Sequence, residues 1–102
     1  MIERRTMTRK DIINTLVSLK EQARDKYKAE IKGIFGSFAR GEDKAGSDID
    51  ILVEFFPGAT LLNLAGLGDF LEENLHHKVD LVSEKAIRKE IEPQIYQDLI
   101  RI

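Results

Sequence analysis

The hydrophobic residues in the first third of the chain recur at helical spacing. Ile12, Leu16, Leu19, Ala23 and Tyr27 lie three or four positions apart, which places their side chains on one face of a helix. Thr8 precedes them, and Asp11 follows it by three residues, a short version of the capping box that stabilises a helix N-terminus. The pattern predicts a long amphipathic helix over about 8–28.

Alternation of apolar and polar residues predicts strands further along the chain. Residues 48–55 show it most clearly, with one apolar face and one face that carries three acidic side chains. The apolar face comprises Ile49, Ile51, Val53 and Phe55, and the other comprises Asp48, Asp50, Leu52 and Glu54. Two shorter β-rich runs cover 31–35 and 78–82, with a short helical turn expected at 37–41 and a polar loop at 42–47.

Helical spacing returns in the second half of the chain. It predicts a helix over about 60–75, although Gly66 and Gly68 inside it each cost about 1 kcal/mol of helix propensity. Residues 84–90 also fit a helix, and Pro93 fits the first turn of a last helix. The buried side of this final part is expected to comprise Ile87, Ile91, Ile95, Leu99 and Ile102. The order of elements predicts a small α/β layered fold, a single domain over 1–102.

Composition supports a folded globular protein, since 42% of the 102 residues are hydrophobic and 33% are charged. The apolar runs are far shorter than the roughly 20 residues that a membrane span needs, and the first residues form no signal-peptide core. With no cysteine, the chain is expected to be cytoplasmic, without disulfides or thiolate metal sites. Residues 1–32 carry a net charge of +4, but acidic residues interrupt the basic ones, which favours a solvated helix face over a nucleic-acid groove.

The candidate chemistry lies between residues 36 and 80. Asp48 and Asp50 fall on one strand face with their Cα atoms about 6.6 Å apart. At about 5 Å between carboxylates, their repulsion is of order 3 kcal/mol at an effective dielectric of 20. A solvated strand edge and a Mg²⁺ site explain the pair equally well. Asp80 lies in another strand-like run, and if the two strands are neighbours, the metal site gains support.

The spacing of Gly36-Ser37, ten intervening residues and Asp48-Ile49-Asp50 resembles the signature of the polymerase β-like nucleotidyltransferase superfamily. The fuller string GSFARGEDKAGSDIDILVEF resembles its smallest branch, the minimal nucleotidyltransferase (MntA-type) antitoxins, which are encoded beside a HEPN-domain toxin. The resemblance implies the nucleotidyltransferase fold, a small mixed sheet of three to four strands flanked by helices. It also implies transfer of AMP from ATP to a hydroxyl, that of a tyrosine, on this ribonuclease toxin.

The same resemblance assigns roles to individual residues. Gly36 and Ser37 would hold the nucleotide phosphates, while Asp48, Asp50 and Asp80 would bind two Mg²⁺ ions. Asp80 would also assist deprotonation of the acceptor hydroxyl. Arg40 either reaches a phosphate or pairs with Glu42 or Asp43. Removing the repulsion in Asp48→Asn should leave the protein at least as stable as the wild type without Mg²⁺.

Two further points stay open in the sequence. The alternative to an enzyme is a binding module that blocks its partner sterically, in which case the carboxylates are dispensable. His76 and His77 are adjacent, a spacing that splays the side chains apart, so a role at the surface of a helix end is favoured over a metal site. Neither a membrane nor nucleic acid is expected as a direct partner.

Overall fold

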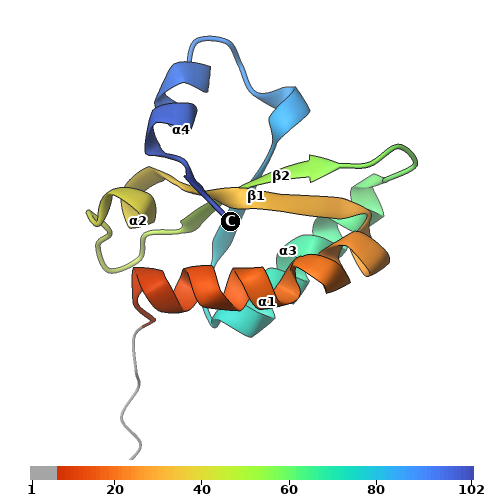
Figure 1. Ribbon diagram of the computed structural model, residues 1–102, viewed down its shortest axis with the longest axis horizontal. Helices are drawn as coiled ribbons and strands as arrows, with labels where there is room; N and C mark the ends of the chain where they lie inside the picture. The colour runs from red at the N-terminus through yellow and green to blue at the C-terminus, as the bar shows by residue number, and fades with distance from the viewer. Residues whose placement is uncertain (1–6) are drawn as a thin grey trace, which may run out of the picture.

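Four strands form one mixed sheet at the centre of the computed structural model, which describes residues 7–102 (Figure 1). The strands are β1 (Ala29–Phe35), β2 (Ile49–Phe55), β3 (Val79–Ser83) and β4 (Ile100–Arg101), in the order β3-β2-β1-β4. β1 pairs antiparallel with β2 and β4, whereas β2 and β3 run parallel. The predicted mixed sheet of three to four strands is therefore confirmed.

Two long helices cover one face of this sheet, α1 (Arg9–Tyr27) and α3 (Leu61–Leu75) (Figure 1). α1 begins as predicted, because the Asp11 N–H donates to Thr8 Oγ1 at 3.1 Å and Asp11 Oδ2 accepts from the Thr8 N–H at 3.0 Å. The apolar face of β2 packs against these helices in the main core. The fully buried side chains of that core include Ile12, Leu16, Ile31, Ile34, Ile49, Ile51, Val53, Leu67 and Leu71.

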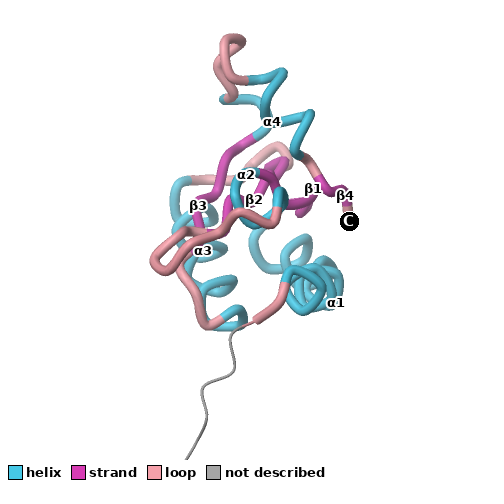
Figure 2. The backbone as a smooth tube through the Cα atoms, turned by 90° about the vertical axis from the view of Figure 1, so that its left-hand side faces the viewer, coloured by secondary structure: helices cyan, strands magenta, loops and turns pink. Residues whose placement is uncertain are grey.

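The opposite face of the sheet is covered only in part. The 3₁₀ helix η1 (Glu84–Ala86) and α4 (Glu92–Asp98) lie over it, and the edge-on view separates them clearly from α1 and α3 (Figure 2). Leu52 and Ile95 are buried outside the main core, which explains how an apolar residue is accommodated on the acidic face of β2. The short helix α2 (Gly36–Arg40) follows β1 directly, as predicted.

The prediction for the C-terminal part was wrong in two respects. Only residues 84–86 of the expected 84–90 helix are helical, and the last helix ends at Asp98 because Leu99 is extended and Ile100–Arg101 pair with β1. Of the side chains expected to line the buried side, only Ile95 is buried, while Ile91 is half exposed. The expected N-terminal features at residues 1–6 lie outside the described residues. Within 7–102, no helix combines the length and apolarity that crossing a membrane requires.

Candidate active site

Three segments bring the predicted site residues together at one end of the sheet. β1 ends at Phe35 and passes directly into α2, while β2 begins at Ile49 and β3 at Val79. Phe35 pairs with Asp50, and Asp50 pairs in turn with Asp80 across the parallel strands. Paired residues of neighbouring strands point to the same face, and the strands lie about 4.8 Å apart. Asp50 and Asp80 therefore share the face opposite the main core, so the expected adjacency is observed.

Gly36 allows the backbone to pass directly against the carboxyl group of Asp50. Its φ of +75° is a left-handed conformation that glycine adopts without strain. A Cβ atom at this position would lie 2.1 Å from Asp50 Oδ2 and 3.0 Å from its Cγ. The next residue, Ser37, is half-buried in the first turn of α2. The glycine-serine turn and the acidic residues thus form one continuous site.

The electrostatic environment of Asp50 is strongly unfavourable to its charge. Burial, followed by the negative charges of Asp80 and Asp48, raises the pKa of Asp50 to about 6. Arg40 acts in the opposite direction, and a hydrogen bond with Asp80 adds to the rise in pKa. A carboxyl group in this state accepts either a proton or a cation to offset its charge.

The side chains present fit a magnesium ion that is shared with a substrate. Mg²⁺ is commonly held by one or two carboxylates together with waters and substrate phosphates. In residues 7–102 no three histidine or acidic side chains are gathered so as to hold a metal ion by themselves. Asp50 and Asp80 supply the adjacent carboxylates, and the exposed Asp48 lies two residues before Asp50. Nucleotide oxygens would have to complete the coordination.

Arg40 makes two ion pairs on the α2 side of the site. Its Nε lies 2.8 Å from Glu42 Oε1, and its Nη1 lies 2.6 Å from Asp98 Oδ2. Both carboxylates raise the pKa of Arg40. The sequence suggests a phosphate, Glu42 or Asp43 as partner, and it gives no sign of the link to Asp98 of α4. In this arrangement Arg40 joins α2 to α4 and still contributes positive charge beside Asp50.

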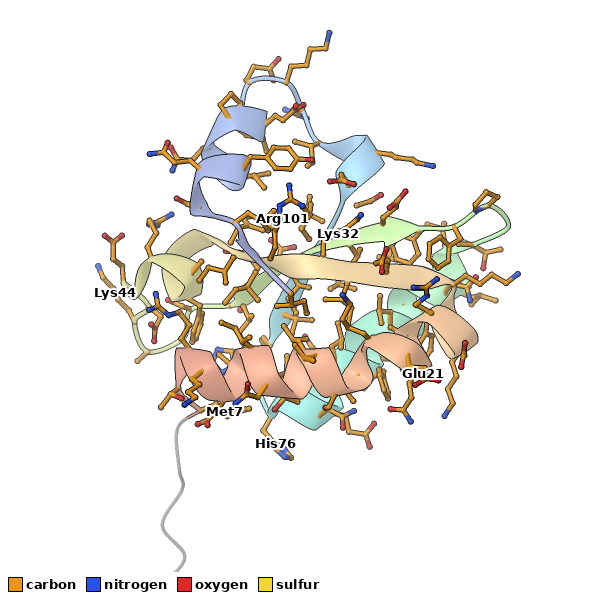
Figure 3. All side chains as sticks on the ribbon, viewed as in Figure 1. Met7, Glu21, Lys32, Lys44, His76 and Arg101 are labelled. Atoms are coloured by element: carbon orange, nitrogen blue, oxygen red, sulfur yellow. The ribbon has the colours of Figure 1, made fainter. Side chains whose placement is uncertain are left out.

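Two side chains near the end of α3 contact the site segments and were not expected to do so. The ring of His77 is half-buried and hydrogen-bonds through Nε2 to the Ser47 carbonyl. Glu72 Oε2 accepts a hydrogen bond from the Val79 N–H at 3.0 Å. The surface role expected for the histidine pair holds only for His76, which is exposed at the end of α3 and points away from the sheet (Figure 3). No periodicity in the sequence marks either contact, and the one from His77 to Ser47 joins residues 30 positions apart.

Known proteins with similar sequences carry nucleotidyltransferase and adenylyltransferase names. A family model described as "Nucleotidyltransferase domain" matches residues 16–102. The protein adenylyltransferase MntA of Thermococcus cleftensis is 32% identical over 96 residues, which cover 94% of this chain and 97% of that protein. A Methanocaldococcus jannaschii relative, whose name proposes protein adenylyltransferase activity, is 42% identical over 83 residues, covering 81% of this chain and 96% of its own.

Solved structures show the same fold. One described as a candidate minimal nucleotidyltransferase superposes with a TM-score of 0.80 at 32% identity, covering 94% of this chain and 97% of its own. The fold also recurs, at a TM-score of 0.70 and 24% identity, in a crystal structure of a toxin–antitoxin with AMP-PNP, over 86% of this chain and 69% of that one. The chain therefore belongs to the nucleotidyltransferase family and is an enzyme of the group that includes the protein adenylyltransferase MntA.

Proposed function

We propose that this enzyme transfers AMP from ATP to a tyrosine hydroxyl of a HEPN-domain ribonuclease toxin and thereby acts as its antitoxin. The observation that carries the proposal is the pairing of Asp50 with Asp80 directly beside Gly36. That arrangement combines closely spaced carboxylates with a turn where backbone can approach a ligand. The relatives named protein adenylyltransferase supply the reaction class, and the toxin–antitoxin with AMP-PNP supplies the class of partner.

Each site residue has a distinct role in this reaction. Gly36 and Ser37 bind the β- and γ-phosphates of ATP, and Asp48 and Asp50 would hold two magnesium ions together with the triphosphate. Bound magnesium would neutralise the negative charge that develops on the phosphate oxygens. Asp80 takes the proton of the acceptor hydroxyl as its oxygen bonds to the α-phosphorus. The bond from that phosphorus to the bridging oxygen breaks, and pyrophosphate leaves.

The exposure of Asp80 fits an acceptor that arrives from another molecule. Asp80 is exposed, whereas Asp50, beside it on the neighbouring strand, is half-buried. This difference in burial supports assigning Asp50 to the nucleotide and Asp80 to the incoming hydroxyl.

The test uses the purified enzyme, the HEPN-domain protein encoded beside it, Mg²⁺, and ATP labelled at either the α- or the γ-phosphate. Label should appear on the partner only from α-labelled ATP, and a Tyr→Phe change at the modified position should abolish it. Asp48→Ala should reduce labelling by at least about 100-fold, the scale of losing correct placement of a reacting group. Asp43→Ala, an exposed acidic position in the same loop, is the matched control and should label normally.

The same experiment separates catalysis from steric neutralisation. If Asp50→Ala loses labelling but still suppresses the ribonuclease activity of the partner as strongly as the wild type, the enzyme neutralises by binding. Absence of label with the wild type, and no difference between the wild type and Asp48→Ala, would contradict the proposed reaction.

A further inference from the structure

We propose that His77 is a positioning residue, which fixes the segment leading to Asp48 relative to the glycine-serine turn. The proposal rests on the proposed function, because it concerns how that site is held together. His77 itself touches no reacting atom in this scheme. It acts through two contacts, each with a neighbour of a site residue.

The first contact is with the loop that precedes β2. His77 Nε2 hydrogen-bonds to the carbonyl oxygen of Ser47, the residue directly before Asp48. A carbonyl oxygen only accepts, so Nε2 must carry the hydrogen and donate it. Most of this loop is exposed, and Ser47 otherwise bonds locally with Lys44. The imidazole therefore ties the end of an exposed polar loop to the folded body.

The second contact is with α2. The rings of His77 and Phe38 meet edge to face, with centroids 5.2 Å apart and an interplanar angle of 79°. Phe38 is only 6% exposed and directly follows Ser37. One imidazole therefore touches both the segment that carries Ser37 and the segment that carries Asp48. His77 therefore lies between the glycine-serine turn and Asp48 and can hold them at a fixed separation.

A parallel contact from the same region supports this interpretation. Glu72 accepts a hydrogen bond from the N–H of Val79, the residue directly before Asp80. The Ile49 N–H donates to the Lys78 carbonyl at 3.0 Å, which joins the starts of β2 and β3. The end of α3 and the turn after it thus contact the residues preceding both Asp48 and Asp80. Because displacement of a reacting group by about 1 Å can cost about 100-fold in rate, such contacts matter for catalysis.

The test compares His77→Gln with His77→Met. The two side chains are similar in length, but only glutamine ends in an N–H donor that can reach the Ser47 carbonyl. His76→Asn is the control for the neighbouring exposed position, since asparagine tolerates the left-handed conformation found there, with φ of +53°. Each variant is assayed for kcat, for KM of ATP and for melting temperature. Binding of Mn²⁺ is measured separately by electron paramagnetic resonance, with an ATP analogue that cannot be cleaved at the α-phosphorus.

We expect His77→Met to lower kcat and to weaken Mn²⁺ binding, each by about tenfold. This loss is smaller than the roughly 100-fold that a full 1 Å displacement of a reacting group can cost. His77→Gln should recover both quantities to within about threefold of wild type, and His76→Asn should match wild type. If the Met and Gln variants behave alike, or lose activity only in proportion to their melting temperatures, His77 has no positioning role. Failure of both variants to fold would also overturn the proposal, because the imidazole would then serve the fold as a whole.

The outcomes distinguish this inference from the proposed function. An active wild type with indistinguishable His77 variants overturns the positioning role alone. A wild type that neither labels a partner nor binds Mn²⁺ overturns the proposed function, and the positioning role with it.

Discussion

At the scale of single residues, Gly36 is the position where the backbone lies directly against the carboxyl group of Asp50. Its backbone is left-handed, and the space that a Cβ atom would need is filled by the carboxyl group of Asp50. Gly46 has a similar φ of +88°, but nothing lies within 4 Å of its would-be Cβ atom. The two glycines therefore share a conformational requirement and differ in their contact with the site.

This difference gives a prediction about catalysis. Gly46→Ala should cost about 1–2 kcal/mol of unfolding free energy, because alanine is disfavoured at positive φ, and Gly36→Ala should cost at least as much, because its Cβ must also displace Asp50. Only Gly36→Ala displaces Asp50, so only this variant should lose AMP transfer, by about 100-fold. Urea unfolding and the labelling assay measure the two effects. Transfer by Gly36→Ala within threefold of Gly46→Ala would show that the contact with Asp50 is not required.

Residue patterns predicted part of the site from the sequence. The period-two spacing of Asp48 and Asp50 predicted both on the polar face of a strand, and in the structure Asp50 lies in β2 while Asp48 directly precedes it. The pairing of Asp50 with Asp80 depends on which strands become neighbours, which local spacing does not encode. The same limit applies to His77, since its partners Ser47 and Phe38 are 30 or more positions away.

At the scale of elements, the two glycines inside α3 have different surroundings. A Cβ atom at Gly66 would lie 2.8 Å from Tyr27 Cε1 of α1, closer than carbon atoms pack. Tyr27 also packs against Phe70, with ring centroids 5.3 Å apart. At Gly68 the nearest atom would be Leu81 Cδ1, at an ordinary contact distance of 3.8 Å. Gly66 is therefore explained by close approach of α1 and α3, and Gly68 is not explained by packing.

We predict different effects of alanine on stability at Gly66 and at Gly68. Gly68→Ala should raise the unfolding free energy by up to about 1 kcal/mol, the helix-propensity difference between the residues. Gly66→Ala gains the same propensity but must displace the Tyr27 ring, so it should be at least about 1 kcal/mol less stable than Gly68→Ala. Chemical unfolding of both variants measures the difference. Equal stabilisation by the two substitutions would mean that the Tyr27 ring moves away from Gly66 without loss of stability.

The C-terminal elements show why helical spacing alone was insufficient. Ile91, Ile95, Leu99 and Ile102 fit a helix, but the chain leaves the helix at Leu99 to pair with β1. At Gly33, a Cβ atom would lie 2.1 Å from the Ile100 carbonyl oxygen, so glycine permits this close pairing. The strand is decided by a contact between residues nearly 70 positions apart. A sequence window that covers only the last helix contains no information about it.

At the scale of the whole molecule, the two faces of the sheet differ in character. One face carries the main core beneath α1 and α3. The other face carries Asp50 and Asp80, with Lys32 and Arg101 on the same side as α4 (Figure 3). Stability therefore comes mainly from one face, while the other retains crowded negative charge. The raised pKa of Asp50 indicates that this charge opposes folding when no cation is bound.

This opposition makes stability depend on pH in a definite direction. The pKa of Asp50 is about 6 in the folded protein and 3.8 as its ordinary value, so between these values the folded state binds more protons. Unfolding free energy should therefore fall as pH rises from about 4 to 6, and stay level with respect to this group above that range. A two-unit shift in the pKa of Asp50 corresponds to a change in unfolding free energy of at most about 3 kcal/mol. Because Asp50 is only half-buried, solvent screening reduces this change to about 1 kcal/mol.

Asp50→Asn isolates this effect, because asparagine keeps the shape of the side chain and does not titrate. In EDTA, the unfolding free energy of Asp50→Asn relative to wild type should increase by about 1 kcal/mol as the pH rises from 4 to 7. This increase should exceed the one found for Asp48→Asn. Asp43→Asn on the exposed loop is the control, which should track wild type. Adding Mg²⁺ together with an ATP analogue that cannot be cleaved at the α-phosphorus should narrow the gap between Asp50→Asn and wild type at pH 7, because a ligand that binds only the folded wild type stabilises it. Urea unfolding at each pH checks these differences, and an Asp50→Asn advantage that is already complete at pH 4 would show that packing, rather than charge, is responsible.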